Sequence, residues 1–359
     1  MCKTSPSEAL ENERLCDWEF SGIRLMTHQN YSEFTTRANL AEGSTSTMDA
    51  GEDAGDGSSA ETTKGRTGVT YSDGSSEDRL LELFSSGDPQ QRIEEALSND
   101  PDWPTLYHLT PVRENLLSWF DFPPEARLLE VGAGCGAITG LFCERLKAVT
   151  AIELTERRAE VIRRRHRHHK NLRVIAGNVH DVAVDDSYDF VTSIGVLEYA
   201  GRFTESATPH EDFLRELRSY LKPDGQLILA IENRFGLKYW SGGREDHTGR
   251  FFDSLEGYPG GQDIRTFGRI ELEELLERSG FGGCRFYYPL PDYKLPVELF
   301  SDAHLPSIDH PVRSSVFPFT DLSQAREFLF NERLAMDNIL ANENFPFFAN
   351  SFLVFAVRK

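Results

Sequence analysis

The clearest pattern along the chain is an alternation of short apolar runs with amphipathic segments. The apolar runs predict five strands, at 127–131, 149–152, 172–176, 188–194 and 226–231. Helical periodicity between them predicts helices at 137–146, 156–169 and 211–221. Nearly continuous apolar strands that alternate with helices are typical of a parallel sheet covered on both faces. The pattern therefore predicts an α/β fold with a doubly wound sheet, over a core at 127–288.

The segments that flank this core have other patterns. Residues 76–126 predict a lead-in of short helices, in which Thr110-Pro111 is typical of a helix N-cap followed by proline. After the core strands we expect a helix at 271–279, a strand at 284–288, a helix at 324–340 and a strand at 352–357. Residues 289 to about 322 are rich in proline and aromatic residues and predict an irregular stretch. We therefore expect an insertion or acceptor cap at 289–350 before a final strand at 351–359.

The first 75 residues differ in composition from the rest. Between 41 and 76, Gly, Ser, Thr, Asp and Glu dominate, and large apolar side chains are nearly absent. Such a segment cannot bury enough apolar surface to offset the entropy lost on ordering. We expect residues 1–75 to be a disordered tail and 76–359 to be the folded domain.

Charge and cysteine content exclude several classes of protein. The formal net charge of −20 disfavours non-specific binding to nucleic acid or to an anionic membrane. The basic run at 163–170 lies in a predicted covering helix, so we assign it to a solvated face. The five cysteines contain no C-x-x-C pair, and no apolar run reaches membrane-spanning length. These features predict a cytoplasmic protein with reduced thiols, no structural zinc and no membrane insertion.

The glycine-rich segment after the first core strand is the main chemical signal. Gly132, Gly134 and Gly136 let the backbone turn tightly and approach a ligand, and the next helix begins with unpaired N–H groups. Glu153 ends the following strand, where an acid can accept both ribose hydroxyls. The segment 132–137 also fits the G-x-G-x-x-A dinucleotide pattern. The loop alone therefore leaves open a nicotinamide-dependent oxidoreductase or epimerase.

Further motifs resemble class I S-adenosylmethionine-dependent methyltransferases. They are Glu130 directly before the loop and the segments 177–179, 188–191 and 221–226. The resemblance implies a seven-stranded, mostly parallel Rossmann-like sheet and S-adenosylmethionine as cofactor. It implies that Glu130, Gly132, Gly134 and Gly136 belong to the methionine site, that Glu153 binds ribose, and that Asn178 contacts adenine where the family often has Asp. Ile194 and Gly195 would face the methyl-transfer centre.

Three other segments, at 107–115, 231–259 and 287–296, look like a bacterial methyltransferase group found beside or fused to glycosyltransferases of cell-surface polysaccharide synthesis. This resemblance implies O-methylation of a sugar, glycan or glycosylated small molecule, with a glycosyltransferase as partner. Methylation of an amine or carboxylate on a non-sugar acceptor remains an alternative.

Several polar residues that follow predicted strands are candidates for proton transfer. His247 is our preferred general base, because a hydroxyl acceptor loses its proton as the methyl group transfers. Asp246 or Glu245 would orient it, and Glu232 and Glu198 are alternative bases. The competing interpretation of His247 is a surface ion pair with its arginine neighbours. The spacing of Glu198, Asp246 and His247 is not a metal signature, so we expect no metal.

Overall fold

The computed structural model describes residues 74–99, 101–184, 187–261, 263–319 and 326–359. By compactness the chain divides into Met1–Met48 and Asp49–Lys359, and every described residue belongs to the second unit. The tail predicted at 1–75 lies outside the described residues except for its last two positions, of which Ser75 begins a helix.

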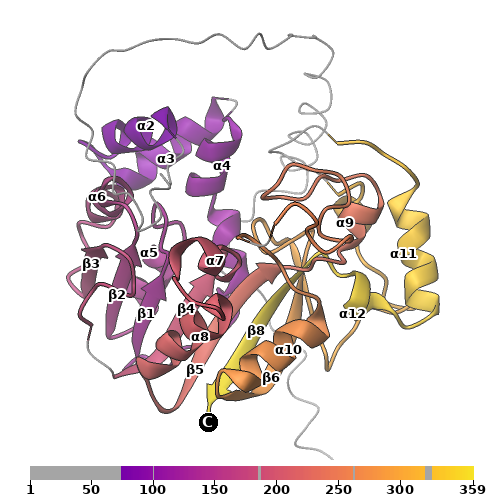
Figure 1. Ribbon diagram of the computed structural model, residues 1–359. Coiled ribbons are helices and arrows are strands. Elements are labelled where there is room, and N and C mark those ends of the chain that lie inside the picture. The colour runs from indigo at the N-terminus through magenta and orange to yellow at the C-terminus, as the bar shows by residue number, and fades with distance from the viewer. Residues whose placement is uncertain (1–73, 100, 185–186, 262, 320–325) are drawn as a thin grey trace, which may run out of the picture. The chain divides into compact units, whose positions relative to one another are not determined.

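An eight-stranded sheet forms the centre of the unit (Figure 1). Its strand order is β3-β2-β1-β4-β5-β8-β6-β7. The strands are β1 (Arg127–Val131), β2 (Ala148–Glu153), β3 (Leu172–Ala176), β4 (Tyr188–Ile194), β5 (Leu221–Glu232), β6 (Phe281–Leu290), β7 (Glu298–Ser301) and β8 (Ser351–Arg358). The strands β1 to β5 are parallel, whereas β8 runs antiparallel to both β5 and β6, and β7 antiparallel to β6. The predicted doubly wound, mostly parallel sheet is confirmed.

The strand count is eight instead of the expected seven. The additional strand is β7, which lies in the proline-rich stretch predicted to be irregular and pairs with β6 from Tyr287↔Ser301 to Leu290↔Glu298. Its four positions are all only partly buried. A short edge strand without a continuous apolar run gives no periodic signal, so the pattern could not predict it.

Helices cover both faces of this sheet (Figure 1). The α-helices are α2 (Ser75–Leu83), α3 (Pro89–Ser98), α4 (Trp103–Leu109), α5 (Thr139–Arg145), α6 (Glu156–Arg165), α7 (Ala200–Phe203), α8 (Pro209–Ser219), α9 (Leu237–Trp240), α10 (Arg269–Arg278), α11 (Glu332–Ala341) and α12 (Phe345–Phe348). Three 3-10 helices are η1 (Pro111–Leu116), η2 (Leu197–Tyr199) and η3 (Ser314–Val316). Among the described residues, no helix combines the length and the apolar composition that crossing a membrane requires.

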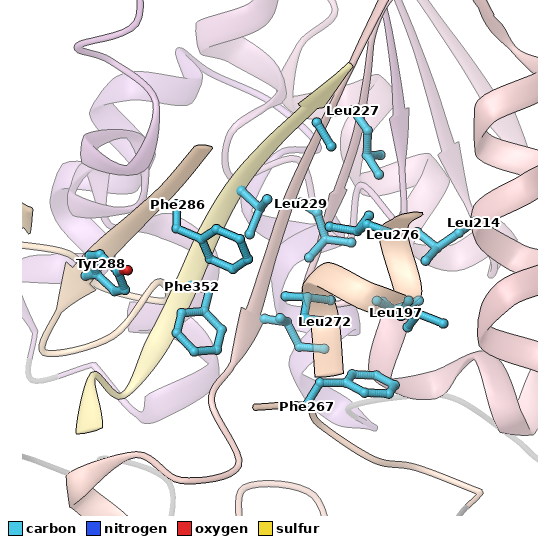
Figure 2. Packing of buried hydrophobic residues seen from close by; sticks show 14 of the residues in the cluster. Leu197, Leu214, Leu227, Leu229, Phe267, Leu272, Leu276, Phe286, Tyr288 and Phe352 are labelled. Carbon is cyan, nitrogen blue, oxygen red and sulfur yellow. The ribbon is translucent and has the colours of Figure 1, made fainter. Parts of the chain in front are cut away.

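The core is split between the two faces because successive side chains of a strand point to opposite sides. On β5, Leu227, Leu229 and Ile231 pack with α8 and α10, whereas Ile228 and Ala230 pack on the side of α5. Figure 2 shows the first group, with the β5 leucines beside Leu214 of α8, Leu272 and Leu276 of α10, and Phe352 of β8. This two-sided burial fixes the strand ends from which the functional loops leave.

The predicted helix at 324–340 is wrong in its first part. Residues 326–331 are not helical, and α11 begins only at Glu332, after Asn331 caps it by accepting a hydrogen bond from the Leu334 N–H at 3.1 Å. The preceding backbone pairs with a distant loop, through Glu327 N–H to Gly242 O at 3.1 Å and Leu329 N–H to Ser241 O at 3.0 Å. Such tertiary pairing overrides local helical propensity.

Two other predicted helices need smaller corrections. The helix expected at 156–169 ends at Arg165, because His166 turns its ring to the Gly136 carbonyl at 2.8 Å. After Thr110 the chain forms the 3-10 helix η1 and not an α-helix, although the Thr110 hydroxyl does accept a bond from the Val112 N–H at 3.4 Å.

Candidate functional site

A cavity of about 400 Å³ lies at the carboxyl ends of β1, β2 and β4, where open α/β sheets bind their ligands. Its wall combines the glycine loop with α4 and η1 and with the loops that follow β4, β5 and β6. The residues that line it are Trp103, Pro104, Tyr107, His108, Arg113, Gly132, Ala133, Gly134, Cys135, Ala137, Glu153, Leu154, Arg158, Ile194, Gly195, Val196, Glu198, Tyr199, Phe203, Asp246, His247, Tyr293 and Lys294. The helical lead-in, the core strands and the segment after β6 therefore all contribute residues to one cavity.

Two glycines of the loop need their lack of a side chain for different reasons. Both Gly132 and Gly134 have φ in the left-handed region, at +74° and +59°. A Cβ on Gly132 would lie 2.3 Å from Val196 Cγ2, so this position is closely packed. A Cβ on Gly134 would meet nothing within 4 Å. The Gly134 backbone therefore borders open space into which a ligand can approach.

Glu153 at the end of β2 is held against this loop. One carboxylate oxygen accepts the Gly134 N–H at 2.9 Å and the other accepts the Thr155 N–H at 3.1 Å. Burial raises the pKa of Glu153 above its usual value, and the charge of Arg158 acts in the opposite direction. The Thr155 hydroxyl, 3.5 Å from the second oxygen, is a third donor. A carboxylate has about four acceptor positions, so one remains, on the oxygen that accepts the Gly134 N–H, for a hydroxyl of a ribose. The predicted ribose-binding role fits this geometry.

A smaller pocket of about 80 Å³ adjoins the cavity. The two spaces share the wall residues Gly132, Leu154, Val196, Tyr199 and Phe203. The remaining wall of the smaller pocket is mostly apolar, with contributions from Ile152, Val179 and Phe213. Such a slot suits the flat apolar faces of an adenine ring.

Asn178 lines this smaller pocket, but its side chain already has partners. Its Oδ1 accepts the His180 N–H at 3.2 Å, and its Nδ2 donates to the Phe203 carbonyl at 3.2 Å. An amide oxygen has a second lone pair, so one acceptor position is left for the amino group of an adenine.

Glu130 and Gly136, expected at the cofactor, are not among the cavity wall residues. Glu130 accepts a hydrogen bond from the Thr139 hydroxyl at 2.7 Å, and burial raises its pKa to about 8. A Cβ on Gly136 would lie 2.9 Å from His166 Nε2. Both residues thus contact other parts of the chain and do not line the cavity. Ile194 and Gly195, in contrast, do line the cavity, at the end of β4.

His247 stands at the other end of the cavity with its side chain 5% exposed. The Tyr199 hydroxyl lies 3.1 Å from Nδ1, and Glu232 Oε2 lies 3.5 Å from Nε2. Its backbone N–H donates to Glu245 at 2.8 Å. This buried position differs from the surface ion pair considered as its alternative.

The acids around His247 decide its protonation. Burial alone would lower the pKa of His247, but the nearby charges of Glu232, Glu198 and Glu245 raise it to about 9. Burial and the charge of Glu232 raise the pKa of Glu198 to about 8. In the absence of a bound ligand, His247 therefore holds a proton at neutral pH, and a nearby cation or a higher pH favours its basic form.

Asp246 and Glu232 belong to a buried network with two lysines. Asp246 pairs with Lys238 Nζ at 2.8 Å and Lys294 Nζ at 2.7 Å, and accepts the Tyr239 hydroxyl at 2.5 Å. Glu232, fully buried at the end of β5, accepts a hydrogen bond from Lys294 Nζ on Oε1 and turns Oε2 to His247. The side chains within 3.5 Å of the His247 ring nitrogens are thus those of Tyr199 and Glu232. Asp246, which was expected to orient the ring, forms ion pairs with Lys238 and Lys294.

One cluster has the spacing of a cation site. It consists of Glu198, Glu232 and His247, and one possible ligand atom of each lies within 4.8 Å of the others. The ammonium group of Lys294 on Glu232 and the raised pKa of His247 both oppose this, because a metal must compete with a fixed positive charge and with a proton. We therefore treat the cluster as a proton-handling site.

Several cavity residues had no role assigned from the sequence. Tyr107 and Arg113 lie in the segment 107–115, and Tyr293 and Lys294 in 287–296. The Arg113 guanidinium stacks 4.2 Å from the centre of the Tyr107 ring and donates to the Lys294 carbonyl at 3.0 Å. The mixture of aromatic and charged residues in both segments was the available signal. Their contact joins positions 181 residues apart, which no local pattern contains.

The family described as "Methyltransferase domain" matches residues 129–229, from β1 to β5. The ribosomal RNA small subunit methyltransferase A of Salinibacter ruber is 35% identical over 77 residues, which are 21% of this chain and 23% of that protein. The ubiquinone biosynthesis O-methyltransferase of Xanthomonas axonopodis pv. citri is 33% identical over 148 residues, 39% of this chain and 59% of that protein. The chain thus spans less than two thirds of the length of these relatives.

Among solved structures, a S-adenosylmethionine-dependent methyltransferase of Thermotoga maritima, described as a possible histamine N-methyltransferase, aligns with a TM-score of 0.40 and 18% identity. The alignment covers 78% of this chain and 99% of that chain.

The strand order separates the two cofactor classes that the glycine loop left open. The usual dinucleotide-binding sheet has parallel strands in the order 3-2-1-4-5-6. In this sheet the strand that follows β5 is β8, which runs antiparallel to β5 and so takes the place of a sixth parallel strand. With the match over 129–229, this decides against the nicotinamide alternative. The core of the chain, from β1 to β5, is thus similar to a methyltransferase domain.

Proposed function

We propose that this chain transfers the methyl group of S-adenosylmethionine to a hydroxyl oxygen of a sugar, a glycan or a glycosylated small molecule. The observation that carries the proposal is that Gly134 and Glu153 line the same cavity as Glu198 and His247. Groups suited to the cofactor and groups suited to an acceptor proton therefore share one space. Its volume of about 400 Å³ is within the usual range for ligand sites, roughly 300–1,000 Å³.

The residues present fit the cofactor from end to end. The apolar pocket beside Asn178 would hold adenine, the remaining acceptor position of Glu153 would bind a ribose hydroxyl, and the open space beside Gly134 would take the methionine part. When bound, S-adenosylmethionine supplies a methyl group made electrophilic by its positive sulfonium. Ile194 and Gly195, on the wall between the two ends, lie where acceptor and cofactor would meet.

In this proposal His247 takes up the acceptor proton at Nδ1. Nε2 is buried against Glu232, whereas Nδ1 contacts the Tyr199 hydroxyl, which belongs to the cavity wall. The hydroxyl proton of the acceptor passes to Nδ1 directly or through the Tyr199 hydroxyl. Glu232 then stabilises the positive ring that results. A base contributes about 10²–10⁴-fold, and alignment of the acceptor supplies much of the rest.

The sugar class is supported by the chemistry of the acceptor end. Trp103, Tyr107, Tyr199 and Tyr293 line the cavity together with carboxylates and His247. Aromatic rings pack on the apolar faces of a sugar, and charged groups bond its hydroxyl edges. The relative from Xanthomonas is named as an O-methyltransferase. The resemblance of 107–115, 231–259 and 287–296 adds a glycosyltransferase partner to the proposal. The scattered cysteines, with no C-x-x-C pair, add a cytoplasmic location.

The test is a search for the acceptor with the full-length chain. The protein is incubated with S-adenosylmethionine labelled in its methyl group and with separate panels of nucleotide sugars, glycans, phenols, amines and carboxylic acids, and products are identified by mass spectrometry. Label in a sugar is expected, and at a limiting cofactor concentration it should fall by roughly tenfold to a hundredfold in the Glu153→Ala variant. Label only in an amine or a carboxylate would support the alternative acceptors and refute this proposal.

A further inference from the structure

We propose that Lys294 is a positioning residue that holds one oxygen of Glu232, offsets part of the charge of this carboxylate, and thereby limits how tightly His247 holds its proton. The inference rests on the proposed function for its use of His247 as the base. Lys294 lies in the loop after β6, and Glu232 ends β5, so the contact links the ends of two strands that β8 separates in the sheet.

Lys294 has few alternatives to this contact. Its side chain is 16% exposed, and its Nζ bonds both Glu232 Oε1 and Asp246 Oδ1, the latter at 2.7 Å. A third carboxylate, that of Asp292, lies 4.0 Å away. Glu232 is completely buried, and Asp246 is 14% exposed. An ammonium group held by several acids in a protein interior has a nearly fixed position.

The contact also fixes the orientation of the Glu232 carboxylate. The Tyr293 hydroxyl, at 3.3 Å, and Lys294 both donate to Oε1. The other oxygen, Oε2, is left facing His247 Nε2 at 3.5 Å and has no hydrogen-bond partner of its own. Lys294 therefore acts on His247 through the way it holds Glu232, without touching the ring.

Lys294 also moderates the field at the imidazole. The charged and titratable groups around His247 are Glu198 and Tyr199 from η2, Glu232 from β5, and Glu245 and Asp246 from its own loop. Tyr293 and Lys294, from the loop after β6, contact Glu232. The acids favour the charged ring, and the ammonium group offsets part of their effect. Loss of Lys294 should make His247 hold its proton more tightly, whereas neutralising Glu232 should make it release the proton more easily.

A purely structural role for Lys294 would neutralise buried acids without affecting His247. The two roles differ in one readout, the titration of the ring itself. Full-length protein with ¹³C-labelled histidine is titrated by NMR, and the His247 signal is assigned with the His247→Gln variant. This measurement needs no acceptor and no turnover, so it can fail or succeed independently of the proposed function.

We expect the His247 pKa to rise in Lys294→Met and to fall in Glu232→Gln. Lys294→Arg keeps the charge and should restore most of the wild-type value. Lys238→Met is the matched control, because Lys238 is equally buried but pairs with Asp246 at 2.8 Å and Asp292 at 3.5 Å, so its effect should be smaller. An unchanged His247 pKa in Lys294→Met, or a shift in the same direction as in Glu232→Gln, would overturn the proposal.

If Lys294→Met does not fold, the titration uses the double variant Lys294→Met/Asp246→Asn instead. This double variant keeps the net charge of the cluster, because it removes one positive and one negative charge. Because this variant also lacks the charge of Asp246, it is compared with Asp246→Asn alone. Relative to that variant, a higher His247 pKa supports the role of Lys294, and an equal or lower value contradicts it.

Discussion

The carboxylate of Glu153 accepts a hydrogen bond from the Gly134 N–H at 2.9 Å, and this bond ties the end of β2 to the glycine loop. The acid expected to bind the ribose is therefore held in place before any ligand arrives. Its position depends on the left-handed backbone of Gly134, with φ at +59°. The two most specific cofactor features of the sequence are thus one structural unit.

Replacing Glu153 by Ala should weaken cofactor binding by roughly tenfold to a hundredfold. Hydrogen bonds to a charged group contribute about 1.5–3 kcal/mol, and about 1.4 kcal/mol corresponds to a factor of ten. Calorimetry with S-adenosylhomocysteine measures the change. Glu125→Ala, which removes an exposed carboxylate paired with Lys147, is the control and should bind normally. Equal affinity for the wild type and Glu153→Ala would show that the acid does not contact the cofactor.

Gly132→Ala and Gly134→Ala should fail in different ways. Both add backbone strain, of order 1–3 kcal/mol, at a left-handed position. Only Gly132→Ala also drives a methyl group into Val196, at 2.3 Å, and it should lower the melting temperature more. Gly134→Ala should instead lose cofactor affinity, since its methyl group enters the open space. Thermal unfolding and calorimetry on both variants test this, and the reverse ranking in stability would contradict the geometry.

The rate should rise with pH between about 7 and 9, because the pKa of His247 is raised to about 9 and only the neutral ring accepts a proton. Stability should change in the opposite direction. A raised folded-state pKa contributes stability that is fully present below the unfolded value near 6.5 and is lost as pH rises through about 9. Glu198, with its pKa raised to about 8, adds to that loss.

Rates and melting temperatures over this range, for the wild type and His247→Gln, measure both effects. The melting temperature of His247→Gln should fall less over this pH range than that of the wild type. A wild-type rate that is flat from pH 7 to 9, with chemistry shown to limit turnover, would exclude His247 as the titrating base.

Removal of divalent metal should leave turnover unchanged. Lys294 already supplies a positive charge to Glu232, and His247 carries a proton. Activity assays after dialysis against EDTA, with and without added Mg²⁺ or Mn²⁺, are the measurement. Activity that disappears and returns only with metal would assign Glu198, Glu232 and His247 to a cation.

The cofactor half of the site followed from local sequence, and the catalytic half only in part. The strands at 127–131, 172–176 and 188–194 were predicted with the bounds observed. The glycine loop and Glu153 lie within 22 residues and share one βαβ unit. The partners of His247 come from η2, from the end of β5 and from its own loop, and Lys294 is 62 residues from Glu232. Only the fold brings these charges together, so spacing could not reveal that Glu232 faces the ring.

The same limit explains the error in the helix predicted at 324–340. Residues 326–331 have apolar positions that fit a helix, yet their backbone pairs with Ser241 and Gly242. Glu130 and Gly136 belong to the glycine motif, and their neighbours Thr139 and His166 lie outside the cavity wall. The motif alone does not show which of its residues line the cavity.

The central claim is that an acceptor hydroxyl loses its proton to His247 while it receives the methyl group. It is tested most directly by NMR of the product made with ¹³C-methyl S-adenosylmethionine, together with single-turnover rates of the wild type and His247→Ala. The account predicts a labelled methyl group bonded to a sugar oxygen, a rate about 10²–10⁴-fold lower in His247→Ala, and unchanged cofactor affinity. A methyl group on nitrogen or on a carboxylate, or a full rate in His247→Ala with a hydroxyl acceptor, would contradict it.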